Sequence, residues 1–129
     1  MTPQNKRAIR IITHSHPRTH CKPIFKKLRI LTIPSLYIYK CVLYVWTHIA
    51  DFQTNADFHN YNTRNSAALH TQRTKRTNTQ RHVNHIGAKL YNTLPVNIRQ
   101  LEDDNKFKTE FKKFLVEQCF YSVNDYVGQ

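Results

Sequence analysis

The sequence predicts a mainly α fold, a small helical domain with a basic, mobile central linker. Only two of the 129 residues are glycine, whereas β-sandwiches and barrels need many tight turns. Apolar residues recur at helical spacing near the C-terminus, from Phe107 to Cys119. The stretch from Asn65 to Gln80 is polar and basic, and it lacks the aromatic and β-branched apolar side chains that drive packing.

Residues 1–58 are expected to form an N-terminal helical part. Asn5–Thr13 predicts a short helix capped by its first residue. A loop, His14–Pro23, follows. Pro23 is expected to occupy the first turn of a helix that ends at Leu28, because proline is tolerated in a first turn.

Ile30–Ala50 is the most apolar stretch and predicts a core helix. Helical spacing places its polar edge at Tyr37, Lys40, Tyr44 and Thr47. A pair of strands is the alternative, because the stretch is rich in β-branched residues. A membrane span is excluded: Lys40 near the bilayer centre would cost about 2.5–3.5 kcal/mol, and Pro34 and His48 shorten the apolar run.

Residues 59–82 are the expected linker, and residues 83–129 are expected to form a C-terminal helical part. Val83–Thr93 predicts a helix in which Gly87, without a side chain, allows close helix packing. A further turn is expected at Asn97–Leu101.

The last helix has the clearest pattern. Its apolar face is expected to consist of Phe107, Phe111, Phe114, Leu115 and Cys119, and its solvent face of Lys108, Lys112 and Lys113. Asp103 and Asp104 precede it, where carboxylates stabilise a helix N-terminus. Ser122–Val127 predicts a final capped turn.

Positive charge is concentrated in residues 1–101, which contain 16 Lys and Arg but only two carboxylates; residues 102–129 contain four against six. Such an excess favours polyanions, and we expect RNA or single-stranded DNA as the partner. A solvated surface without a partner is the alternative. The expected phosphate-binding residues are Arg64, Arg73, Lys75, Arg76, Arg81 and Lys89.

The cysteines Cys21, Cys41 and Cys119 are odd in number and widely spaced, which predicts free thiols and a reducing compartment. The N-terminus has too short an apolar run for a signal peptide, so we expect a cytoplasmic or nuclear protein. The loop residues His14, His16 and His20, together with Cys21, are typical zinc ligands, but no second ligand pair stands at a suitable distance. The sequence therefore predicts no metal and no cofactor.

Two short motifs, HNYNTRN (His59–Asn65) and LYNTLP (Leu90–Pro95), stand out. The first is rich in Asn and Thr, whose side chains bond to nearby backbone, and predicts a structured turn. In the second, Pro95 disfavours helical geometry at Leu94 and ends the preceding helix. Both motifs therefore have a complete structural explanation.

Five ordered blocks nevertheless resemble a known family and together span Lys6 to Tyr126. They are KRAIRII, PIFKKLRILTIPSLYIYKCVLYV, HNYNTRN, GAKLYNTLPVNIRQL and FKTEFKKFLVEQCFYSVNDY. In this order they resemble the C-terminal region, after the palm, of the polymerase protein of jockey-like non-LTR (LINE-type) retrotransposons. The resemblance implies a thumb-like remnant in residues 1–58 and an incomplete fold whose earlier part is absent.

The activity of that family, RNA-directed DNA polymerisation, is not expected here. Two-metal nucleotidyl transfer needs carboxylates on a rigid frame, and the Tyr-x-Asp-Asp motif of the palm does not occur. Asp103 and Asp104 are better explained as helix-capping residues. The sequence thus predicts a non-catalytic fragment that binds nucleic acid through Lys and Arg. A helical protein-interaction module and a functionless retrotransposon remnant are the alternatives.

The first prediction concerns catalysis. Purified protein mixed with primed template, deoxynucleotides and Mg²⁺ or Mn²⁺ is expected to extend no primer, because the palm carboxylates are missing. Denaturing gel electrophoresis of a labelled primer measures this. Extension that disappears in the double variant Asp103→Asn with Asp104→Asn would contradict the assignment of these residues to capping.

Overall fold

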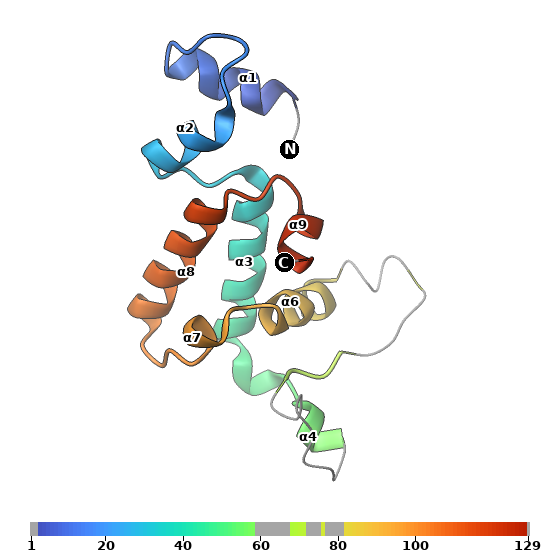
Figure 1. Ribbon diagram of the computed structural model, residues 1–129. Coiled ribbons are helices and arrows are strands. Elements are labelled where there is room, and N and C mark those ends of the chain that lie inside the picture. Colours follow the sequence, from blue (N-terminus) through green and yellow to red (C-terminus); the bar gives the residue numbers. More distant parts are fainter. Residues whose placement is uncertain (1–2, 59–67, 72–75, 77–81, 129) are drawn as a thin grey trace. The chain divides into compact units, whose positions relative to one another are not determined.

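The computed structural model describes residues 3–58, 68–71, 76 and 82–128, and its described elements are helical (Figure 1). They are α1 (Pro3–Ile12), α2 (Cys21–Leu28), α3 (Ile33–Thr47), the 3-10 turn η1 (Ile49–Asp51), α4 (Asn55–Phe58), α6 (Val83–Asn92), α7 (Val96–Arg99), α8 (Asp104–Gln118) and α9 (Val123–Val127). The mainly α class is confirmed. Within the described residues, the β pairing is limited to an isolated antiparallel bridge between Thr54 and Leu69.

The helices belong to two compact units. Unit 1 combines Met1–Tyr39 with Leu101–Gln129, and unit 2 is Lys40–Gln100. The boundary falls inside α3, so this helix contributes its first half to unit 1 and its second half to unit 2. Most of the linker expected at residues 59–82 lies outside the described residues.

The core of unit 1 is built on the apolar face of α8, as its sequence pattern predicts. Phe107, Phe111 and Leu115 are fully buried. The ring of Phe111 stacks on Tyr39, with ring centroids 5.8 Å apart. Lysines 108, 112 and 113 on the opposite face are exposed, which confirms the amphipathic pattern.

The N-terminal helices pack on the end of this core. α1 packs against α2, and α2 contacts α8. A buried cluster of Ile9, Cys21, Phe25 and Cys119 joins α1 and α2 to the residue that follows α8. The two ends of the sequence therefore share one apolar core.

Helix ends follow local chemistry, with two corrections to the predicted bounds. The Asp103 side chain accepts a hydrogen bond from the Lys106 backbone N–H, and Ser122 caps α9 in the same way, as expected. α1 begins at Pro3, so Asn5 lies inside the helix and does not cap it. Pro23 lies in the first turn of α2, as predicted, but the helix begins at Cys21, so the predicted loop ends at His20.

In unit 2, α6 approaches the second half of α3 at Gly87. A Cβ atom at this position would lie 2.7 Å from Cγ2 of Val45, which is too close for real atoms. Val42, Val45 and Leu90 are fully buried. The close approach predicted for Gly87 is confirmed, and the predicted polar edge of α3 is likewise exposed at all four of its positions.

The second prediction tests the core of unit 1. Phe111→Ala is expected to lower the free energy of unfolding by about 3–5 kcal/mol, since it removes a fully buried ring. The neighbouring exposed substitution Lys112→Ala is expected to change it by less than about 0.5 kcal/mol. Urea denaturation followed by circular dichroism measures both. Equal unfolding midpoints for the two variants would mean that α8 does not dock through this face.

Candidate nucleic-acid interface

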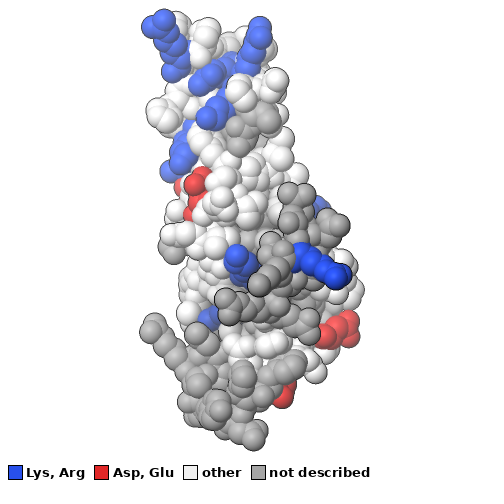
Figure 2. Space-filling model, turned by 90° about the vertical axis from the view of Figure 1, so that its right-hand side faces the viewer, with Lys and Arg blue, Asp and Glu red and all other residues white. Residues whose placement is uncertain are grey.

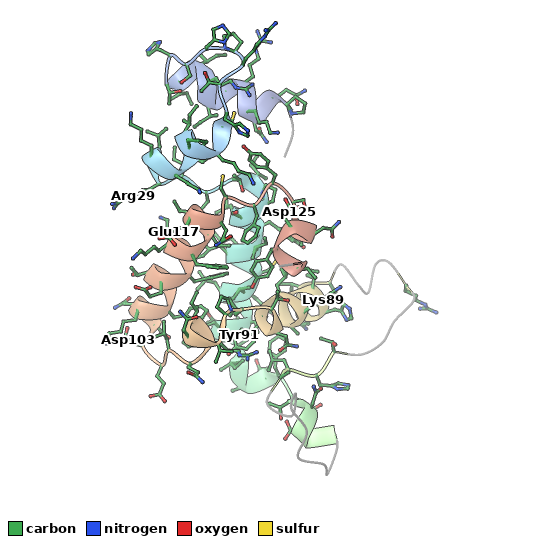
Figure 3. The ribbon with its side chains drawn as sticks, viewed as in Figure 1. Arg29, Lys89, Tyr91, Asp103, Glu117 and Asp125 are labelled. Carbon is green, nitrogen blue, oxygen red and sulfur yellow. The ribbon has the colours of Figure 1, made fainter. Side chains whose placement is uncertain are left out.

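The structure describes two of the six residues predicted to bind phosphate. Arg76 and Lys89 are exposed, and Lys89 is on α6 (Figure 3). The other predicted residues, Arg64, Arg73, Lys75 and Arg81, lie outside the described residues. The predicted interface is therefore represented in the structure by single side chains from separate segments.

A denser basic region lies in unit 1, over α1 and α2. The first 50 residues contain no carboxylate, and eight Lys and Arg lie between positions 6 and 29. Figure 2 shows Lys and Arg side chains gathered at the end of unit 1 formed by these two helices, without acidic side chains among them. The sum of these charges gives the surface a positive potential.

Three of these eight side chains have structural contacts. The Nζ atoms of Lys6 and Lys22 lie 4.4 Å and 4.9 Å from the centroid of the Tyr121 ring, so both ammonium groups make cation–π contacts with this ring. Arg10 donates from Nε to the Thr19 carbonyl oxygen at 2.8 Å. The remaining five, Arg7, Arg18, Lys26, Lys27 and Arg29, are exposed. They are the side chains of this region best placed to meet a ligand.

Two of the exposed cations border a groove between α2 and α8, called the α2–α8 groove below. Its volume is about 680 Å³, and its described lining residues are Lys26, Arg29, Thr109, Lys112, Lys113, Val116 and Glu117. Four cations therefore face one carboxylate. Figure 3 places Arg29 at the C-terminal end of α2 and Glu117 on the adjoining part of α8.

Local backbone geometry sets the direction of the α2 side of the groove. Arg29 adopts a left-handed conformation, with φ of 55°, and ends the helix. Its N–H donates to the Lys26 carbonyl oxygen, and the Ile30 N–H donates to that of Phe25. These bonds satisfy the last carbonyl groups of α2 and reverse the chain toward α3.

Sequence patterns gave no indication of this groove. They placed Lys112 and Lys113 on the solvent face of the last predicted helix, whereas Lys26 belongs to the separate predicted helix that ends at Leu28. The four cations come together only because the N-terminal and C-terminal segments share unit 1. A useful signal would have been the absence of carboxylates from the first 50 residues, which marks this region as the more uniformly basic.

The described residues do not assemble a metal or nucleophilic centre. Within them, no group of three or more His, Cys, Asp or Glu side chains could hold a metal ion. All three cysteines are buried, and none belongs to a disulfide. Burial raises the pKa of the Cys119 thiol, an effect that Lys22 and Lys26 partly oppose, so Cys119 is less readily ionised than an ordinary thiol.

Comparison with known proteins adds no family to this description. No family model, curated protein or solved structure matches the chain.

Among the described helices, none is by itself long and apolar enough to cross a membrane; α2 and α3 satisfy that test only as a bent pair.

Proposed function

We propose that the chain is a non-catalytic segment that binds RNA or single-stranded DNA through Lys and Arg contacts to phosphate. The observation that supports this most strongly is the α2–α8 groove, in which four cations from two helices face one carboxylate. The resemblance to the region after the palm of non-LTR retrotransposon polymerases agrees with it. In such a protein this segment would hold the nucleic acid, and another part would perform the chemistry.

The physical basis is the release of counterions from the phosphate backbone. Each phosphate neutralised by Lys or Arg frees condensed cations, so affinity falls steeply as salt rises. Such contacts position a protein on the nucleic acid but do not distinguish one base sequence from another. A groove with these charges is therefore expected to bind different sequences alike. The linker residues Arg73, Lys75 and Arg76 are proposed as further contacts of the same kind.

A helical protein-interaction module is the second candidate. Four large apolar side chains between the end of α2 and the first turns of α3, namely Leu28, Ile30, Ile33 and Leu36, are 40–58% exposed. Exposed apolar side chains close together favour contact with another protein. This candidate predicts no dependence of partner binding on the groove lysines.

The third prediction tests the groove by salt dependence. For single strands, the slope of log affinity against log salt is about −0.7 per phosphate contact. The double variant Lys112→Gln with Lys113→Gln is expected to flatten the slope of the parent by about 1.4. Removal of the groove carboxylate in Glu117→Gln is expected to strengthen binding at low salt. Fluorescence anisotropy with a labelled oligonucleotide at several salt concentrations measures both.

A matched control comes from the same helix. Lys106 and Lys108 are exposed on α8 but do not line the groove. The variant Lys106→Gln with Lys108→Gln removes the same charge and is expected to change the slope by less than about 0.5. Equal slopes for the parent and the groove variant would show that the groove is not the contact surface. The triple variant Arg73→Ala, Lys75→Ala and Arg76→Ala then tests the linker.

A further inference from the structure

Unit 2 contains a hollow of its own, with a volume of about 480 Å³. Its walls come from the end of α3, η1 and the two residues after it, residues 70–71, and the start of α6. Four of the lining side chains are histidines, at positions 48, 70, 82 and 85, and two more are the aromatic rings of Tyr44 and Phe52. The volume falls in the range of about 300–1,000 Å³ typical of small-molecule sites.

Backbone and side-chain hydrogen bonds fix the walls of the hollow. The His70 backbone N–H donates to the Gln53 carbonyl oxygen at 2.7 Å, and the Asn55 N–H donates to that of Ala68 at 2.9 Å. The side-chain amide of Asn92 on α6 both accepts from the Leu69 N–H and donates to the Leu69 carbonyl oxygen, each at 2.8 Å. The segment carrying His70 is thus tied to the residues after η1 and to α6.

One wall presents an aromatic pair. Tyr44 and His48 are one helical turn apart at the end of α3. Their ring centroids are 4.4 Å apart, and the ring planes make an angle of 30°. His48 Nδ1 lies 2.9 Å from the Tyr44 carbonyl oxygen. Because a carbonyl oxygen only accepts, Nδ1 is the donor, and this bond holds the imidazole beside the tyrosine ring. Tyr44 is 37% exposed, so part of its ring surface is open to a ligand.

The chemistry of the lining discriminates between ligand classes. Its described residues include no Lys or Arg but do include Asp51, which disfavours phosphate. The histidines form no group that could hold a metal. The aromatic rings and uncharged polar side chains of the lining instead suit a planar ligand with hydrogen-bonding edges.

The polar side chains suit such edges, because they provide both donors and acceptors. The amides of Gln53 and Asn84 each have an oxygen that accepts and an NH₂ group that donates. His82 Nδ1 accepts from the Asn84 backbone N–H, so a neutral His82 carries its proton on Nε2 and donates there. Nucleobases combine planar faces with donor and acceptor edges, which matches this wall.

We propose that this hollow receives an unpaired nucleobase, stacked against the Tyr44–His48 pair. The proposal rests on the proposed nucleic-acid binding and adds to the phosphate contacts a contact with an unpaired base. In a duplex the faces of the bases are covered by their neighbours, whereas an unpaired base can leave the stack and meet an aromatic side chain. Stacking of this kind tolerates different bases, in agreement with binding that does not depend on sequence.

The experiment compares two labelled strands of equal length, oligothymidylate and a strand of abasic sites with the same number of phosphates. The parent is expected to bind oligothymidylate more tightly by about 5- to 150-fold, the range for one stacked base. Tyr44→Ala and His48→Ala are each expected to reduce that ratio without changing affinity for the abasic strand. Tyr44→Phe keeps the ring and is expected to retain the ratio.

Tyr37→Ala serves as the matched control, because Tyr37 is an exposed tyrosine on the same helix that does not line the hollow. Its ratio is expected to equal that of the parent. Equal binding of the two strands by the parent would overturn the base site and leave the phosphate contacts standing. Failure to bind either strand would overturn the proposed function together with this inference. An unchanged ratio in both Tyr44→Ala and His48→Ala would also overturn the base site.

Discussion

The buried hydroxyl of Thr32 links the start of α3 to the segment that follows α8, within unit 1. The hydroxyl caps α3 by accepting a hydrogen bond from the Ser35 backbone N–H at 3.2 Å. The backbone carbonyl oxygen of Thr32 accepts a second bond, from the Leu36 N–H. The same hydroxyl donates its single proton to the carbonyl oxygen of Phe120, 88 residues further along the chain. One side chain therefore both starts α3 and fixes the segment that follows α8.

That long-range bond lies at the same end of α8 as the buried cluster through which α1 and α2 meet Cys119. α8 contacts α2 there, and cations from both segments border one groove. Tyr121, the next residue, lies under the ammonium groups of Lys6 and Lys22. Phe120 also packs edge-on against Tyr126 of α9, whose pKa is raised by burial. The proposed phosphate surface thus depends on contacts between the two ends of the sequence.

Local patterns predicted the longer helices α1, α2, α3, α6 and α8, because the spacing of apolar residues, caps and prolines acts over a few helical turns. They did not predict η1 or α4. The buried face of α8, the exposed edge of α3 and the close approach at Gly87 were all predictable in this way. The groove and the hollow were not, since both bring together residues distant in sequence. Asn92 illustrates the difference: within its motif it suggested only a helix end, yet its amide anchors Leu69, 23 residues earlier.

The central claim, that Thr32 joins the two ends of the chain, is tested most directly by the unfolding free energies of two variants. Thr32→Val keeps the shape but leaves the buried Phe120 carbonyl and the Ser35 N–H without this partner, and a loss of about 2–4 kcal/mol is expected. Thr32→Ser keeps the hydroxyl and is expected to lose less than about 1 kcal/mol. Equal losses in the two variants, measured by urea denaturation, would contradict the account.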